Sequence, residues 1–496
     1  MAGEAWKARA LEAWGSLRAA GIAPLLTRER LAIGFALLFF LTAFSVYWFL
    51  GPKDTGFDNH INQANSFLHG RLDLVPELSG YITEPAIKDD KLYLQHPLGP
   101  AILLVPWVAL FGLDTNQTLV SVLIGAISAP VIFAITRRFT ENLTAQVWLT
   151  ILFLFGTIFW YTASNGGVWF FSHTMAVLFL FLAIYVTLKS RNPFLIGLFL
   201  GVAYLSRQSM ILALPFFLIM LSDDWLLKDN GQSLLKRVNI KPLAQLGSGA
   251  GIFLLISFVL NYLRFSNPLE SGYHFSEQVH QEQLAWLFNH GVFHITYIPR
   301  HIPVFFEGLP IFRSEAPYIL PSWAGMAIWG TTPAFLYGLF VGIRDRRVIA
   351  IGGSLLFAAI AIIIWRGVAG AFDLGWKGFD FILGVHLLPF YGMIALAIVT
   401  GLRDRNKLVI ACWAAIIPIV LTNFSFAATG WTQFGYRYAL DFYPFLFLLT
   451  LIAIGDDIRW HHKLLIVLSI VVNLWGVLWI YQFQPRGFLG LEWVGF

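Results

Sequence analysis

Long apolar runs dominate the chain from residue 31 to residue 482, and most of the connections between them are short and polar. Two shorter runs, 193–206 and 208–222, flank Arg207 and predict a tight helical pair. The pattern predicts an all-α polytopic membrane protein with about thirteen transmembrane helices, since about twenty apolar residues cross a bilayer as a helix. The longer runs are 31–50, 117–136, 144–163, 171–188, 243–264, 322–343, 348–365, 381–400, 408–425, 438–455 and 464–481.

Composition agrees with this class and excludes others. Of 496 residues, 57% are hydrophobic and only 12% are charged, which is roughly half the charged fraction of a soluble domain. A soluble enzyme and a disordered chain are therefore excluded. Cys412 is the one cysteine, so no disulfide can form within the chain. A net charge of +5 spread over a membrane protein gives no reason to expect nucleic-acid binding.

The basic residues predict the orientation. Most of the 33 Lys and Arg residues lie in the N-terminal segment and in connections that fall on the same side of a thirteen-helix arrangement, whereas most acidic residues lie on the other side. Because basic loops stay in the cytoplasm, we expect a multi-pass protein of the cell (plasma) membrane with a cytoplasmic N-terminus. Residues 1–30 are expected to form a cytoplasmic amphipathic leader.

Two long connections, 51–98 and 265–321, differ from all the others because they are long, aromatic and on the predicted external side. Long loops in compact proteins are usually functional or disordered, and the aromatic content favours order. We therefore expect the working surface to be external. We predict two modules. Residues 31–225 are expected to form a catalytic module that contains the first long connection, and residues 226–496 a variable transmembrane module that contains the second long connection.

The first loop contains a predicted interfacial helix that ends at Gly70. Its apolar stripe consists of Phe57, Ile61, Ala64 and Leu68, and the stripe one residue later consists of Asp58, Asn62, Asn65 and His69. A partly desolvated Asp58 would have a raised pKa and could act as a general base. An acid at this position could instead cap the helix. The spacing of residues along the chain does not distinguish a general base from a capping residue.

The order of features over roughly the first 225 residues resembles the GT-C superfamily of integral-membrane glycosyltransferases. The protein mannosyltransferase-like and aminoarabinose-transferase-like members are the most similar. The resemblance rests on the basic N-terminus, one helix, the external loop with its early Asp58, the element Gln95-His96-Pro97 before an apolar helix, and the turn Ser206-Arg207-Gln208. The segments at 264–273 and 430–442 look like elements of uncharacterised bacterial relatives.

The resemblance implies inverting transfer of a sugar from a polyprenyl-phosphate donor to an acceptor on the external face. Asp58 matches the residue that deprotonates the acceptor, and Asp54 is the alternative. Two departures stand out: Asn59 follows the Asp where many relatives have Glu, and His96 stands where some have Lys. Whether Glu84 supplies a second carboxylate is open. With Asn62, His69 and Asp54, Glu84 forms the predicted acceptor-binding or supporting set.

A departing lipid phosphate requires cations at the membrane boundary. Arg207 is the first candidate because it interrupts an apolar hairpin, where an arginine costs a few kcal/mol unless paired or hydrated. Arg437, Arg300 and His96 are the others. A structural alternative exists for each of the first two, because Arg207 could pair with a loop acid and Arg437 with nearby Asp441.

No confident metal site follows from the sequence. The histidines lack the spacing and the helical Glu of a zinc protease. Any divalent cation would be Mg²⁺ or Mn²⁺ on oxygen ligands, with Asp58 and Glu84 the expected ligands.

A polytopic transporter or a lipid-linked-sugar flippase is the alternative function. Transporters place ionisable groups and broken helices near the bilayer midplane, whereas here the charges lie at predicted helix ends. The glycosyltransferase is therefore favoured. The sugar, the acceptor class, the lipid chain length and the oligomeric state cannot be read from the sequence.

Overall fold

The protein is an all-α polytopic membrane protein, as the hydrophobic pattern predicts. The computed structural model describes residues 28–74, 82, 84–227, 233–371, 382–430 and 432–483, so most of the predicted leader lies outside the described residues. Within them, eight helices are long and apolar enough to cross a membrane, and five apolar helices are shorter.

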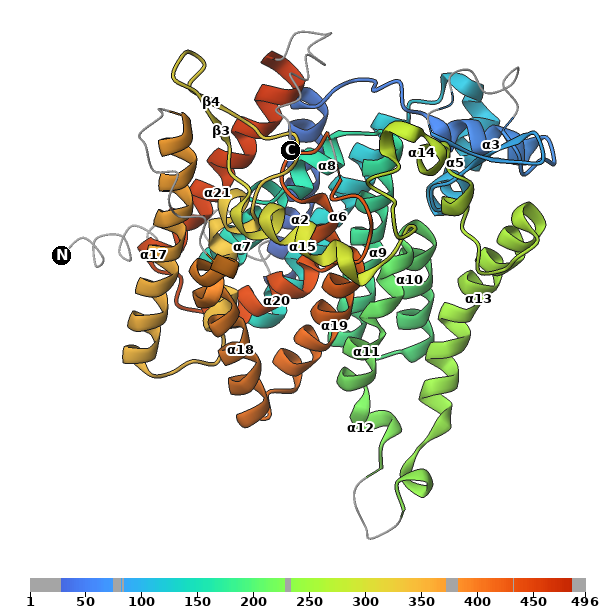
Figure 1. Ribbon diagram of the computed structural model, residues 1–496. Helices are drawn as coiled ribbons and strands as arrows, with labels where there is room; N and C mark the ends of the chain where they lie inside the picture. The colour runs from blue at the N-terminus through green and yellow to red at the C-terminus, as the bar shows by residue number, and fades with distance from the viewer. Residues whose placement is uncertain are drawn as a thin grey trace, which may run out of the picture.

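Helices α6, α9 and α20 are largely buried and contribute to one extended hydrophobic core (Figure 1). The long helices are α2 (Arg28–Leu50), α6 (Gln117–Phe139), α9 (Val168–Lys189), α13 (Ile240–Phe265), α17 (Arg346–Ala371), α18 (Leu388–Arg403), α19 (Lys407–Phe424) and α21 (Trp460–Leu478). The shorter ones are α3 (Asn59–Leu68), α5 (Gly99–Phe111), α7 (Leu143–Phe155), α8 (Phe159–Ser164), α10 (Pro193–Ser206), α11 (Leu214–Met220), α12 (Ser222–Trp225), α14 (Glu277–His280), α15 (Ile298–Ile302), α16 (Ile328–Thr331) and α20 (Tyr443–Ile454). Two antiparallel hairpins complete the described elements, β1 (Pro85–Lys88) with β2 (Lys91–Leu94) and β3 (Ile311–Phe312) with β4 (Ile319–Leu320).

Three apolar runs that were expected to form single helices are broken. The run 322–343 contains only α16 and a 3₁₀ segment, Pro333–Phe340, because Thr332 precedes a proline and adopts a non-helical conformation. The run 144–163 divides at Gly156 into α7 and α8. The run 438–455 divides at Phe442 into a 3₁₀ turn, Arg437–Asp441, and α20. Hydrophobicity alone does not reveal these breaks.

Close helix contacts position the α10–α13 pair beside the site. A Cβ atom on Gly197 would lie 2.1 Å from the backbone oxygen of Leu246, and one on Gly249 would lie 2.3 Å from that of Phe194. These glycines therefore let the two backbones touch, as small residues do in membrane helix pairs. The C-terminal end of α13 is thereby held beside the C-terminal end of α10, where Arg207 follows.

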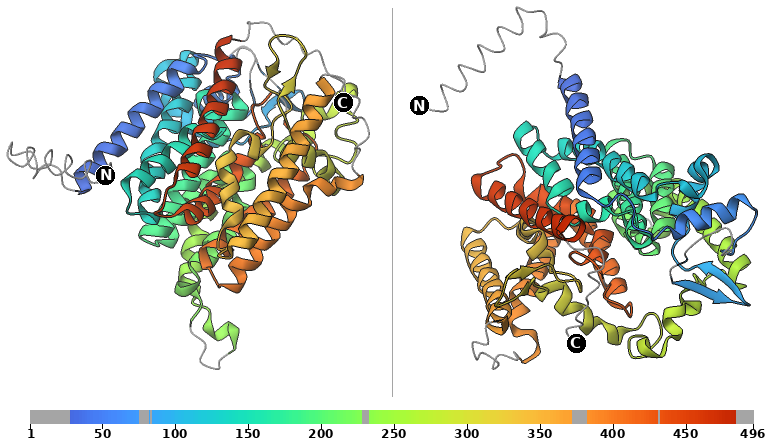
Figure 2. Two further views of the ribbon diagram at one scale, coloured as in Figure 1. Left: turned by 90° about the vertical axis from the view of Figure 1, so that its left-hand side faces the viewer. Right: turned by 90° about the horizontal axis from the view of Figure 1, so that it is seen from above.

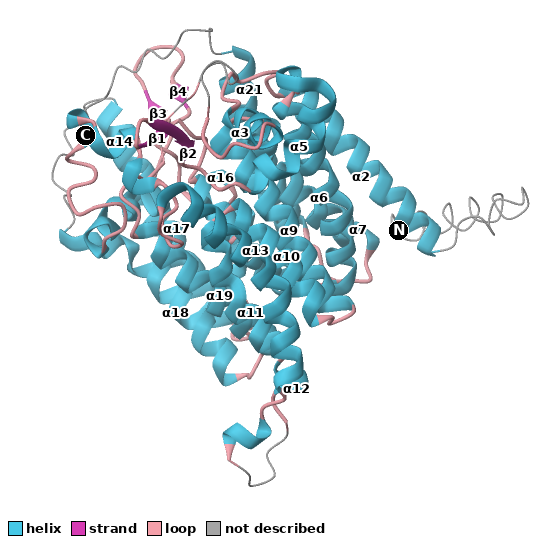
Figure 3. Ribbon diagram, turned by 90° about the vertical axis from the view of Figure 1, so that its right-hand side faces the viewer, coloured by secondary structure: helices cyan, strands magenta, loops and turns pink. Residues whose placement is uncertain are grey.

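The two long connections lie at the same end of the helix bundle, which we name the loop end (Figure 3). Figure 2 shows the described residues between α12 and α13, 226–227 and 233–239, at the opposite end. The hairpin β1–β2 turns at Asp89 and Asp90, both of which have positive φ as a tight hairpin turn requires. An isolated bridge between Ala86 and Ser276 joins the first long connection to the second. The described parts of the two connections are thus in direct contact.

Helix α3 ends before Gly70, as predicted, but its faces differ from the expectation. Asn62, expected on the exposed polar face, is buried, and so are Asn59, His60 and Gln63. Leu68, expected on the apolar stripe, is exposed. Ile61 and Ala64 of the apolar stripe are buried as predicted, but protein also covers the polar side of α3, so its polar side chains help form the interior of the loop end.

Candidate functional site

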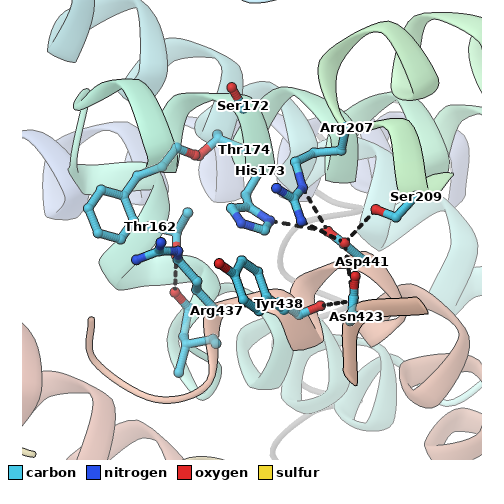
Figure 4. A network of polar contacts seen from close by, with 12 residues as sticks. Thr162, Ser172, His173, Thr174, Arg207, Ser209, Asn423, Arg437, Tyr438 and Asp441 are labelled. Carbon is cyan, nitrogen blue, oxygen red and sulfur yellow. Dashed lines mark hydrogen bonds and ion pairs between the residues drawn. The ribbon is translucent and has the colours of Figure 1, made fainter. Parts of the chain in front are cut away.

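Asp441 is the centre of a buried polar network at the loop end (Figure 4). Its carboxylate is fully buried. Arg207 donates from Nη2 to Oδ2 at 2.9 Å and from Nε to Oδ1 at 3.3 Å. Ser209 Oγ donates to Oδ2 at 2.6 Å, Asn423 Nδ2 donates to Oδ2 at 3.3 Å, and His173 Nδ1 lies 3.2 Å from Oδ1. Burial by itself would raise the pKa of Asp441, but the Arg207 charge and His173 hold this pKa well below its usual range.

The Tyr438 ring lies between two arginines. The Arg207 guanidinium carbon is 5.5 Å from the ring centroid and that of Arg437 is 5.3 Å from it, so both make cation–π contacts. Arg437 also lies 5.6 Å from the Phe170 ring and is buried. Arg207 is ion-paired with Asp441, so the structural interpretation of Arg207 as one half of a salt bridge is confirmed. The pair between Arg437 and Asp441 that the sequence suggested is not among the ion pairs found between described residues.

Glu84 brings a second carboxylate to the same region. Its Oε2 accepts from Trp169 Nε1 at 3.1 Å and from Gln95 Nε2 at 3.4 Å. Burial raises the pKa of Glu84, while the Trp169 hydrogen bond and the Arg437 charge oppose that rise. The backbone of Glu84 has φ +52°, a conformation that L-residues adopt at a cost and that clusters at functional sites.

His96 and His60 are neutral in this environment. Both are buried, and burial lowers the pKa of each to about 3. His60 Nε2 lies 3.1 Å from the Val168 oxygen and 3.2 Å from Ser172 Oγ, which ties α3 to the start of α9. A neutral imidazole gives His96 no positive charge for a phosphate. The positive charges of Arg437 and Arg207 also oppose protonation of His96 and so help to lower its pKa.

Asp58 occupies the position before α3 but does not cap it. No side-chain cap hydrogen bond is present, and within the described residues its carboxylate has no hydrogen-bond or ion-pair partner. Burial and the nearby Asp54 charge raise the pKa of Asp58 to about 6. The preceding residue, Phe57, packs on Trp169 with ring centroids 5.0 Å apart, and Trp169 in turn contacts Glu84. An unpaired carboxylate thus borders the polar region.

The remaining predicted residues are less central. Asp54 is exposed and accepts from Gly56 N at 3.0 Å, and exposed His69 contacts only the Asn65 oxygen among the interactions found for its side chain. Arg300 donates to the Leu287 and Trp286 oxygens at 2.7 and 3.2 Å, within the second long connection. None of these contacts places Arg300 beside Arg207.

The described residues do not offer a donor set for Mg²⁺ or Mn²⁺. They contain no group of three or more His, Cys, Asp or Glu side chains able to hold a metal ion. The two expected ligands, Asp58 and Glu84, share no contact found in the described part of the chain, and Glu84 Oε2 already accepts two N–H groups. We therefore derive no step through a metal.

Sequence reasoning missed several residues that the fold brings to the site. His173 and Asn423 lie inside the predicted apolar runs 171–188 and 408–425, Trp169 lies just before the first of these runs, and Ser209 was not singled out. The sequence contained a weak signal for these residues. A polar side chain within an apolar membrane segment costs free energy unless it has a hydrogen-bond or ion-pair partner. For His173 and Ser209 the partner is Asp441, which lies more than 200 residues away in the sequence.

Comparison with known proteins gives little direct guidance. No protein-family model matches the chain, and no curated protein matches it. Among solved structures, the chain is similar to one described as the crystal structure of ArnT from Cupriavidus metallidurans bound to undecaprenyl phosphate. The identity is 14%, the match covers 90% of this chain and 78% of that one, and the TM-score is 0.35. The two folds superpose only loosely, so the function of this chain rests on its own residues.

Proposed function

We propose that the protein is a membrane glycosyltransferase that transfers a sugar from a polyprenyl-phosphate donor to an acceptor hydroxyl, with inversion at the anomeric carbon. The observation that carries this proposal is Asp58, a half-buried carboxylate that has no partner among the described residues and whose pKa is raised to about 6. A general base works best when its pKa lies near the operating pH. Structural carboxylates, such as Asp441 here, are instead paired and have lowered pKa values.

The proposed reaction is a single displacement. Asp58 accepts the proton of the acceptor hydroxyl, whose oxygen forms the new bond to the anomeric carbon on the face opposite the departing phosphate. The bond between that carbon and the phosphate oxygen breaks, and the lipid phosphate retains the electron pair. Buried cations stabilise the negative charge that develops on the departing phosphate. Arg437, whose charge acts on Glu84 and His96, and Arg207, whose charge acts on His96, are proposed to fill this role. Glu84 is proposed to hold the acceptor.

A direct assay tests the function. The purified protein in lipid nanodiscs would be incubated with polyprenyl-phosphate sugars labelled in the sugar and with cell-envelope acceptor fractions. We expect label to move from lipid to acceptor. If no donor yields product, and the protein in vesicles instead moves the lipid-linked sugar between leaflets, the flippase alternative replaces this proposal.

Transfer should depend on pH through Asp58. The base acts only when deprotonated, so we expect kcat/KM to fall about tenfold per pH unit below pH 6. Asp54→Asn removes a charge that raises the pKa of Asp58, and the acid limb should therefore move to lower pH. A profile that is the same in both proteins would contradict the assignment of Asp58.

We also propose that the loop end faces the outside of the cell. The single native cysteine, Cys412, is buried, so cysteines introduced elsewhere can be labelled selectively. We expect Asp90→Cys, in the exposed β1–β2 turn, to react with an impermeant maleimide on intact cells. Arg405→Cys, exposed between α18 and α19, should react only after permeabilisation. The reverse pattern would place the site in the cytoplasm.

A further inference from the structure

A cavity lies at the end of the helix bundle opposite the loop end, beside the turn between α18 and α19. Its volume is about 190 Å³, whereas one water molecule needs only about 10–15 Å³. Figure 1 shows α18 and α19 meeting at this end, away from the two long connections. The lining includes Arg344, from the segment before α17, together with Thr400, Asp404 and Asn406. The cavity therefore has room for a polar group of several atoms.

The lining presents hydrogen-bond donors that no described protein group uses. The exposed Arg344 guanidinium has no hydrogen bond or ion pair among the described residues. Thr400 is only 5% exposed, and its hydroxyl also has no partner in the described part of the chain. The Asn406 side chain accepts from Val409 N at 3.2 Å through Oδ1, and its amide N–H groups have no described acceptor. A nearly buried hydroxyl is rarely left unpaired, so the cavity is chemically incomplete without an acceptor.

The surroundings of the cavity carry an excess of positive charge. Segments 344–347 and 403–407 contain six basic residues and two acids. One acid, Asp404, accepts from Arg403 Nε at 3.1 Å, and the other, Asp345, accepts a backbone N–H through Oδ1 at 2.8 Å. Neither acid is paired with the arginine of the lining. The acceptor that suits these donors is therefore an anion, because charge and hydrogen bonding then favour the same ligand.

The surface beside the cavity indicates an anion that carries apolar chains. Val399 and Leu402 flank the lining part of α18 and are 57% and 55% exposed. On α17, which begins just after the lining segment, Ile351 and Leu355 are 61% and 52% exposed. Basic pockets between membrane helices bind the heads of anionic phospholipids. A lipid could place its charged head in the cavity and its chains against these apolar side chains, whereas a soluble anion would use the cavity alone.

We propose that this cavity, which we name the Arg344 cavity, binds the phosphate of an anionic glycerophospholipid. Arg344 pairs with the phosphate oxygens, Thr400 and Asn406 donate hydrogen bonds to them, and the acyl chains lie against the exposed sides of α17 and α18. With the loop end outside the cell, as proposed above, this lipid belongs to the cytoplasmic leaflet. Inorganic phosphate offers the same oxygens without the chains. The proposal goes beyond the proposed function and does not depend on sugar transfer.

Titration of the purified protein in neutral detergent with phosphatidylglycerol, followed by native mass spectrometry, tests the proposal. We expect Arg344→Gln to weaken binding about tenfold, the effect of losing a charge-assisted hydrogen bond. Thr400→Val keeps the shape of the side chain and removes its hydroxyl, so it should weaken binding roughly fivefold. Arg138→Gln is the matched control, since Arg138 is an exposed arginine without a described partner at the end of α6 and outside the lining. This control should bind as wild type.

Two further ligands and a stability measurement separate the possible outcomes. All three variants should unfold at the wild-type temperature. Phosphatidylcholine, whose head has no net charge, should bind about tenfold more weakly than phosphatidylglycerol, and excess inorganic phosphate should compete poorly with the lipid. Wild-type affinity in both cavity variants, or an equal loss in Arg138→Gln, would overturn the Arg344 cavity as the site. Equal binding of the two lipids would contradict recognition of an anion, and ready displacement by inorganic phosphate would contradict the choice of a lipid.

Discussion

Replacing Asp58 by Asn should reduce kcat for sugar transfer by about 10²- to 10⁴-fold, the contribution typical of a general base. The substitution keeps the size of the side chain and removes only its ability to accept a proton. Because the carboxylate has no partner among the described residues, the fold should not depend on it. The kcat would be measured with the labelled donor at pH 7.5, where wild-type Asp58 is deprotonated.

A matched control and a stability measurement make this result interpretable. Asp90→Asn changes an exposed acid in the β1–β2 turn, and Asn tolerates the left-handed conformation found there. Both variants should unfold at the wild-type temperature, and Asp90→Asn should also transfer sugar at the wild-type rate. Near-normal turnover by Asp58→Asn would assign the base to another residue, with Glu84 the next to examine.

Asp441→Asn should be the most destabilising of the single substitutions considered. It leaves the Arg207 guanidinium uncompensated in the interior, and breaking a buried ion pair by removing one partner costs about 3–5 kcal/mol. Ser209 and Asn423 also donate to this carboxylate. We expect a large fall in the unfolding midpoint, measured in detergent, and a lower yield of folded protein.

A double variant distinguishes an ion-pair effect from a simple packing defect. Arg207→Met combined with Asp441→Leu removes both charges, and replacing a buried pair by apolar side chains is often neutral or stabilising. The double variant should therefore be more stable than Asp441→Asn, although Ser209 loses an acceptor. If the double variant were less stable than Asp441→Asn, the unpaired charge of Arg207 would not be the source of the loss.

The place of α3 could be predicted because it depends on nearby residues: Asp58 precedes the helix in a long polar connection, and Gly70 follows its end. The catalytic role of Asp58 was implied by the family resemblance and stays a prediction. The charge state of His96 was not predictable, because its lowered pKa results from burial and from arginines distant in sequence.

The sequence by itself determined the class of the protein, the location of most helices and the two long connections. These properties depend on hydrophobic length and on the spacing of a few residues, which are local quantities. The tertiary structure decided which polar groups compensate one another. Arg207 meets Asp441 across 234 positions, and α3 buries polar side chains that its own periodicity assigned to the surface. Electrostatic energy in a low-dielectric interior depends on distances in space, and a linear pattern does not contain them.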